Sequence, residues 1–454
     1  MNYNSHTFRA SVVAVLLTAA PAVQAQQPTA PLTLQAAVDE AFASRPALKG
    51  AAAGQAAADA RLAEARGGHY PSVTLGERVT NSNNPVFVFG TLLEQGRFGP
   101  ENFRIDSINA PDPVTNFRSQ VDMRVPLFDG RKTSTRTEQA RLGRAQADTE
   151  RELAEQRVRF EVVSAYYGVL AATAATDVAA DAVATAEADA ARVRDRVEAG
   201  LVVTSDLLAV EVQLAEFRQQ KLRADGDLAS AYAALDAAIG ASPGARRVLA
   251  GEPGRRTFDA PALDELVRTG IAERPDLLAL ELEIRTHDES IRAARGEYLP
   301  RVDAFASVGN SGDKLTNGSG DYTVGVAVTY TLFDKGRRPR IDAAVAERDL
   351  AVADRDERVN QVRLEIVRAY EDFVAAKEQT KVAEKSVDDA VETHHIVRNR
   401  YEAGITTVTE VLRSETALVR ARFNHLNARY AYAVGYAGLL CAAGELTDVT
   451  PFTE

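Results

Sequence analysis

The chain contains two copies of one long pattern. Short groups of residues in the first half return in the same order in the second half, first at a separation of 229 residues (274 − 45) and later at 204 (402 − 198). A unit of this size exceeds the roughly 20 to 50 residues of a solenoid repeat, so each copy is a complete supersecondary assembly. The matching groups are Arg45-Pro46-Ala47-Leu48 with Arg274-Pro275-Asp276-Leu277, Ala65-Arg66-Gly67 with Ala294-Arg295-Gly296, Leu127-Phe128-Asp129 with Leu332-Phe333-Asp334, and Glu198-Ala199-Gly200 with Glu402-Ala403-Gly404.

The duplication divides the chain into five segments. We predict a signal peptide at 1–25, a first repeat at 32–240, a linker at 241–260, a second repeat at 261–444 and a C-terminal tail at 445–454. Each repeat is expected to contain a helix, a β-hairpin, a long helix, a tip turn and a further helix.

The N-terminus is typical of an exported protein. Arg9 precedes the apolar run 10–20, and Val23-Gln24-Ala25 presents small residues at the positions that signal peptidase reads. We expect cleavage after Ala25, because an uncleaved anchor needs about 20 apolar residues. No cysteine lies near this site, so N-terminal lipidation is not expected.

The composition narrows the possible partners and architectures. A net charge of −11 and a pI of about 5.3 argue against nucleic acid and against a polybasic membrane patch. Cys441 is the only cysteine, so an intrachain disulfide is impossible. We predict no transmembrane helix beyond the N-terminal segment, and a membrane-spanning part must then consist of strands.

Four segments show the alternation of a β-strand. The clearest is 322–332, where tyrosine, valine and leucine side chains face one way and small or hydroxyl side chains the other. Its length approaches the 9 to 11 residues of a tilted outer-membrane strand. The intervening stretches 81–119 and 309–321 are predicted to be loops, the first of them longer. The other three alternating segments are Val73–Gly76, Val121–Leu127 and Val302–Val308.

Four strands flanked by long helices neither form a useful sandwich nor close a barrel alone. Each open edge would bury unpaired backbone groups in lipid. Three chains supply twelve strands (3 × 4), which lies within the known range for closed barrels. The strands therefore favour a homotrimer, with a soluble sandwich as the alternative.

Two long helices are expected between Lys132 and Ala199 and between Pro339 and Ala403, where no proline interrupts the chain. About 65 residues at 1.5 Å each make a rod about 100 Å long. Apolar residues in both stretches have the spacing of a coiled-coil seam. The residues of this predicted seam are Leu153, Phe160, Val163, Tyr167 and Leu170 in the first helix and Leu364, Val367 and Val374 in the second.

Each rod is expected to end at a glycine and turn back as a helical hairpin. Gly200 and Gly404 have the position of a left-handed C-terminal cap. Thr407 and Glu410 then match a capping box at the start of the next helix, whereas Thr204 or Ser205 with Asp206 caps the first copy less ideally. The hairpin tips lie at the end opposite the strands.

In this order, and twice over, these features resemble the TolC family of outer-membrane efflux channels, from about Leu32 to Gly444. The resemblance implies a mainly α protein with a membrane β-barrel. In that fold a homotrimer forms a 12-stranded outer-membrane barrel, four strands per chain, continuous with a long periplasmic α-helical coiled-coil barrel. The motifs that carry the resemblance are Arg274-Pro275-Asp276-Leu277, Tyr298-Leu299-Pro300, Leu332-Phe333-Asp334-Lys335-Gly336 and Tyr401-Glu402-Ala403-Gly404-Ile405.

The resemblance also implies partners and a gate at the tips. The partners are outer-membrane lipid, a periplasmic adaptor (membrane fusion) protein, and an inner-membrane pump or ABC transporter. Glu410 matches an acidic aperture position, Ser205 and Asp206 match positions that hold the inner hairpin shut, and Tyr401 matches their aromatic partner. The adaptor-docking residues implied at the tips are Gly200, Leu201, Val203, Gly404, Ile405 and Thr407.

Two gate positions depart from the family pattern. Thr406 stands where the family has an arginine, and Arg413 stands at a second acidic ring position. We therefore expect fewer constraints on the closed gate and a less acidic throat. The alternative for Asp206 and Glu410 is that each only complements the helix macrodipole at an N-terminus.

The leading hypothesis is a passive exit duct of a tripartite efflux or type I secretion system. The alternative is the periplasmic coiled-coil adaptor of such a system. An enzyme is not expected, since the sequence has neither a P-loop nor a Gly-x-Ser-x-Gly elbow. We expect no cofactor or metal: His394 and His395 diverge by about 100° on a helix, and for 309–321 a hairpin loop is favoured over a Ca²⁺ site. The transported substrate is left open.

Overall fold

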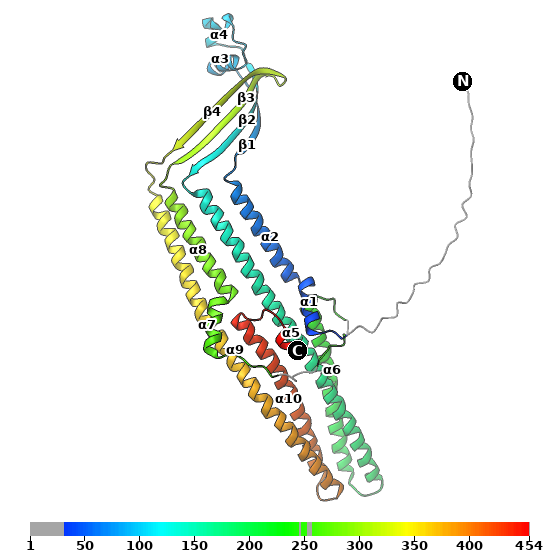
Figure 1. The fold of residues 1–454 in the computed structure, drawn as a ribbon. Helices are drawn as coiled ribbons and strands as arrows, with labels where there is room; N and C mark the ends of the chain where they lie inside the picture. The colour runs from blue at the N-terminus through cyan, green and yellow to red at the C-terminus, as the bar shows by residue number, and fades with distance from the viewer. Residues whose placement is uncertain (1–30, 245–246, 252–256, 454) are drawn as a thin grey trace, which may run out of the picture.

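The computed structural model describes residues 31–244, 247–251 and 257–453. The chain is elongated, with a β-sheet at one end, helices that run away from it, and two helical hairpins at the other end (Figure 1). The predicted signal peptide lies outside the described residues.

The predicted duplication is confirmed by two matching series of elements. In each series two helices precede a strand, and a second strand leads into a very long helix that turns back into a shorter one. The first series is α1 (Leu34–Ser44), α2 (Pro46–Gly67), β1 (Ser72–Ser82), β2 (Val114–Asp129), α5 (Lys132–Glu198) and α6 (Thr204–Ile239). The second series is α7 (Leu263–Glu273), α8 (Pro275–Gly296), β3 (Arg301–Lys314), β4 (Asn317–Thr329), α9 (Arg337–Glu402) and α10 (Val408–Ala443).

The four strands form one antiparallel sheet in the order β1-β2-β3-β4. One face is apolar: Leu75, Val121, Val308 and Tyr322 form a row across all four strands, and each is exposed in the single chain. The opposite face is polar and carries Arg118, which bonds Asp321 at 3.0 Å. The predicted alternation is therefore confirmed, with the apolar residues on one face of a continuous sheet.

The predicted loop at 309–321 is wrong. β3 continues to Lys314 and β4 begins at Asn317, so only a two-residue turn separates the strands. The glycine, asparagine and aspartate residues of this stretch suggested a loop. They instead belong to paired strands, where Gly309 lies opposite Asp321.

The stretch predicted as the first loop contains three short helices in addition to strand ends. These are α3 (Pro85–Glu94), the 3-10 helix η1 (Pro100–Phe103) and α4 (Ile105–Asn109), which lie beyond the end of the sheet (Figure 1). The end of α3 is fixed to the polar face of the sheet: the Gln95 amide donates to Asn116 Oδ1 at 3.0 Å, and Arg97 pairs with Asp313 at 3.2 Å. The extra length of the first copy thus forms a folded cap on the polar side of the strands.

The predicted rods are confirmed as α5 and α9, with 67 and 66 residues. The predicted seam is correct for Val163, Tyr167 and Leu170, which are buried. It is wrong for α9, where the buried residues fall on a different phase and the predicted residues are exposed, because the single chain covers the other face of this helix. The buried side chains of α9 include Val359, Val362, Ile366 and Phe373, whereas Leu364, Val367 and Val374 are 48%, 37% and 36% exposed.

The repeated Arg-Pro motif ties each short helix pair to its long helix. Arg274 donates to Asp276 at 2.9 Å, to Glu365 at 2.9 Å and to the Ala442 carbonyl at 2.7 Å. Arg45 makes the equivalent ion pair with Glu161 on α5. The two junctions share the ion pair to the long helix, and they differ in that Ala47 stands at the position of Asp276.

One described helix, α5, is long and apolar enough to cross a membrane by length and composition alone. The prediction that no such helix exists beyond the N-terminal segment is therefore wrong. Alanines in its central part account for this, as they raise the hydropathy of a helix that packs against α6, α2, α8 and α10.

Candidate functional site at the helical tips

The two hairpin tips have nearly identical turns. Gly200 and Gly404 adopt φ of 72° and 73°, as the left-handed cap predicts. The Leu201 amide donates to the Arg196 carbonyl at 2.8 Å, and the Ile405 amide bonds the Arg400 carbonyl at the same distance. The Gly200 amide also donates to the Val197 carbonyl at 2.9 Å, and the Gly404 amide to the Tyr401 carbonyl at 3.0 Å. The two bonds together define a Schellman motif in both copies.

The predicted side-chain caps are wrong. Thr407 and Val203 are the N-caps of α10 and α6, and neither provides a side-chain cap bond in the described chain. The Thr407 carbonyl instead accepts from the Glu410 amide at 3.2 Å, while the Glu410 side chain pairs with Arg413 at 3.0 Å. Glu410 therefore does not close a capping box, because Arg413 holds its carboxylate on the helix surface.

The residues predicted to meet the adaptor lie at the ends of the hairpins. Leu201, Val203 and Ile405 are 72%, 62% and 66% exposed, and apolar side chains exposed together at a tip are typical of a docking surface. Gly200, Gly404 and Thr407 are exposed beside them. Their docking role stays a prediction.

The single chain does not bring Tyr401 together with Ser205 or Asp206. Tyr401 instead faces Arg196 of the other hairpin, whose guanidinium carbon lies 5.4 Å from the ring centroid. Its hydroxyl has no hydrogen-bond partner among the described residues. Thr406 is half-buried beside it. The gate roles of these residues, and of Glu410 and Arg413, are therefore taken up below as proposals.

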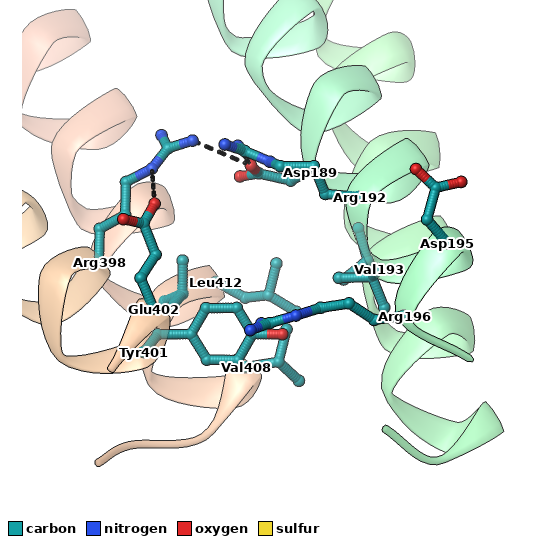
Figure 2. A pocket seen from close by; sticks show the side chains of 12 residues that line it. Asp189, Arg192, Val193, Asp195, Arg196, Arg398, Tyr401, Glu402, Val408 and Leu412 are labelled. Atoms are coloured by element: carbon teal, nitrogen blue, oxygen red, sulfur yellow. Dashed lines mark hydrogen bonds and ion pairs between the residues drawn. The ribbon is translucent and has the colours of Figure 1, made fainter. Parts of the chain in front are cut away.

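A cavity of about 320 Å³ lies between the two hairpins just above the tips. Figure 2 shows Tyr401 and Arg196 on one side of it and an ion pair on the other. In that pair, Arg398 of α9 reaches Asp189 of α5, with 3.2 Å between Nη2 and Oδ1. Arg192 also pairs with Asp189. This contact between hairpins was not predicted: Arg398 belongs to the repeated stretch before the tip glycine, but nothing in the repeat indicates that it pairs with Asp189 on the other hairpin.

Glu415 on α10 is a second feature that the sequence analysis missed. Its side chain is 3% exposed, and neither carboxyl oxygen has a hydrogen-bond partner among the described residues. The pKa of this carboxyl is raised to about 7: burial is the main cause and the charge of Asp189 adds to it, while Arg398 acts in the opposite direction. A signal was present in the sequence: Glu415 interrupts the apolar stripe formed by Val408, Val411 and Val419.

The part of the chain that the structure describes contains no group of three or more histidine, cysteine or acidic side chains arranged to hold a metal ion. His394 instead lies 3.1 Å from the Ser414 hydroxyl, Nδ1 to Oγ.

A sheet with one apolar and one polar face, joined to two helical hairpins about 100 Å in reach, defines a subunit of a membrane channel. The match to known families is specific. The model of the outer membrane efflux protein family matches residues 37–241 and 266–445, and the chain belongs to this family.

Known relatives agree over most of the chain. Protein CyaE of Bordetella pertussis is 28% identical over 427 residues, which cover 91% of this chain and 84% of CyaE. Among solved structures, the outer membrane protein VceC of Vibrio cholerae superposes with a TM-score of 0.75 at 20% identity and covers 90% of this chain and 96% of VceC. The open state of the MtrE outer membrane channel of Neisseria gonorrhoeae gives 0.73 at 18% identity, with 91% and 89% covered.

These matches confirm the predicted fold class, a mainly α protein with a membrane β-barrel. The family match confirms the exit duct over the adaptor alternative, since the family is that of outer membrane efflux proteins. The family is one of transport proteins.

Proposed function

We propose that three copies of this chain form the outer-membrane exit duct of a tripartite efflux or type I secretion system. The observation that carries the proposal is the open sheet. In the described chain β1 and β4 each have one strand neighbour, so both edges present unpaired backbone groups. Closure by β1 of one copy and β4 of the next removes these edges, and twelve strands result (3 × 4).

The long helices support the same assembly. Leu350, Leu364, Val367 and Val374 are exposed along α9, and Val382 is 71% exposed farther down the helix. A row of this length on one helix is expected to pack against another chain. The helices of three copies would then enclose a tunnel that continues the barrel.

The duct has no energy source of its own, so its partners supply the transport step. An inner-membrane pump or ABC transporter drives the substrate, and a periplasmic adaptor docks at the tips on Gly200, Leu201, Val203, Gly404, Ile405 and Thr407. Opening is a population shift, in which the adaptor binds separated hairpins better than closed ones. Ser205, Asp206, Tyr401, Thr406, Glu410 and Arg413 line the aperture that these hairpins close.

We propose that signal peptidase cleaves after Ala25 and that the mature protein carries no lipid. N-terminal sequencing tests the cleavage site, and the intact mass tests for an attached lipid.

The test of the duct itself is the conductance of the purified protein in a planar lipid bilayer, with its mass in detergent measured in parallel. We expect a trimer that conducts in steps of uniform size and whose conductance grows when the adaptor is added. A monomer in detergent with no conductance would contradict the proposal.

A further inference from the structure

The two hairpins use one duplicated arginine in different ways. Arg194 and Glu211 in the first hairpin correspond to Arg398 and Glu415 in the second, because 398 − 194 and 415 − 211 both equal 204, the separation of the copies at the tips. Arg194 on α5 pairs with Glu211 on α6 at 2.9 Å, within its own hairpin. Arg398 instead crosses to Asp189 on the other hairpin.

This difference leaves Glu415 without a counter-charge in contact. Glu211 is on the surface, with its side chain 42% exposed, whereas Glu415 is 3% exposed. The carboxyl of Glu415 lies in the stripe of Val411 and Val419, and Val419 packs in the apolar cluster between the hairpins. A buried carboxylate without hydrogen bonds is strongly unfavourable, so Glu415 is held there as the neutral acid.

Few charged groups face Glu415. Asp189, with its partner Arg192, approaches from α5, and Arg398 approaches from α9. His394, also on α9, contacts the neighbouring Ser414, and burial lowers its pKa, so the imidazole is neutral near pH 7.

The remaining neighbours add little charge. From α6, the neutral Gln213 contacts this turn and accepts from Thr416 at 3.3 Å. On α10 itself, Arg422 lies about two turns away. Arg398 also pairs with the exposed Glu402, one turn along α9, at 3.7 Å. In the interior between the hairpins, Arg398 is the cation for which Asp189 and Glu415 compete.

We propose that Arg398 exchanges between two acidic partners, Asp189 and Glu415, and that this exchange depends on the proton of Glu415. The ion pair of Arg398 with Asp189 holds the two hairpins together, and we call it the latch. In the latched state, Arg398 binds Asp189 and a neutral Glu415 is buried. When Glu415 loses its proton to water, its carboxylate takes Arg398 into the arrangement that Arg194 and Glu211 already show in the first hairpin. The cross-hairpin ion pair is then lost and the tips separate.

The direction of the pH effect follows from proton linkage. The latched state holds the proton on Glu415 up to about pH 7, whereas a hydrated or arginine-paired glutamate has released it at about pH 4.5. Latching therefore takes up one proton: it is strongest below about pH 4.5 and weakens as the pH rises to about 7. Across this window the latching equilibrium constant falls by on the order of a hundredfold.

The latch is an interaction within one chain and can be tested without transport. The inference that its release opens the channel rests on the proposed function. The latch is therefore tested by distance. Spin labels are placed at Leu201→Cys and Ile405→Cys in a Cys441→Ala background, and labelled chains are diluted with unlabelled chains in full trimers. The separation within one chain is then measured by pulsed electron paramagnetic resonance at about pH 5 and about pH 8.

We expect the separation to grow with pH in the otherwise native chain and to stay short at both pH values in Glu415→Gln. The matched control is Glu211→Gln, the counterpart in the first hairpin, which should respond as the native chain does. A native chain with no pH response, or a Glu415→Gln chain that still responds, would overturn the latch. Infrared spectroscopy adds a readout independent of transport: the native protein should show a protonated carboxyl band near pH 6 that Glu415→Gln lacks, and its presence in both would overturn the proposal. Conductance of the same samples tests the proposed function separately.

Discussion

The sheet makes a sharp prediction about which of two adjacent residues tolerates a charge. Val326 lies on the apolar face of β4, 61% exposed, with Tyr322 and Tyr330 four residues away on either side. Ala327, the next residue, lies on the polar face opposite Asp303. We place Val326 near the bilayer midplane, because the two tyrosines match the aromatic girdles that mark the membrane interfaces.

The expected magnitudes differ between the two positions. An arginine on the lipid face near the midplane costs about 2 to 4 kcal/mol, so Val326→Arg in three copies costs about 6 to 12 kcal/mol per trimer. Ala327→Arg points into water beside a carboxylate and should cost little. The assay is urea unfolding of trimers reconstituted in lipid bilayers, followed by the loss of the folded gel band. If Ala327→Arg lowers the urea midpoint as much as Val326→Arg does, the assignment of the two faces is wrong.

Four further outcomes follow from the structure. Gly404→Ala forces a side chain into φ of 73° and should destabilise the second tip by about 1 to 2 kcal/mol, which faster limited proteolysis at that tip would report and an unchanged rate would contradict. Arg274→Ala removes one of the two arginines that pair with the half-buried Asp276, and Arg358 remains as its partner. The free energy of unfolding should fall by about 2 kcal/mol in denaturant titrations, with the exposed Arg268→Ala as a nearly neutral control. Burial favours a higher pKa for Asp276, but hydrogen bonds from Arg274 and Arg358 hold its pKa below the usual value. The stability that these bonds supply is present above about pH 4 and is lost as the pH falls further. Asp276→Asn should therefore reduce the acid-induced loss in the free energy of unfolding. Tyr401→Phe and Asp206→Ala should each change single-channel conductance if these residues belong to the gate, and unchanged conductance in both would remove them from it.

The strands could be located from the sequence, because a strand between lipid and water needs apolar and polar side chains in alternation. The alternation of Tyr322, Val324, Val326 and Val328 is a local property, and each of these side chains lies on the apolar face. The strand ends were not predictable from composition. Ser311 and Asp321 resemble loop residues, but they extend the strands because Arg118 bonds both of them on the polar face.

Helix ends and helix contacts show the same contrast. Gly200 and Gly404 were sufficient to locate the tips, since few other residues adopt their backbone conformation. The phase of α9 was wrong because Val362, Ile366 and Phe373 are buried by neighbours that a single helix does not reveal. The contact of Arg398 with Asp189 escaped prediction for a related reason, since it joins elements 209 residues apart (398 − 189).

The closure of the barrel between chains is the central claim, and disulfide crosslinking of β1 to β4 tests it most directly. In a Cys441→Ala background, Leu75→Cys is combined in turn with Tyr322→Cys, Val324→Cys and Val326→Cys, all on the apolar face. The account predicts that at least one pair gives a covalent species of three chains and none larger. Crosslinks that form only within one chain, or a ladder that continues beyond three, would contradict it.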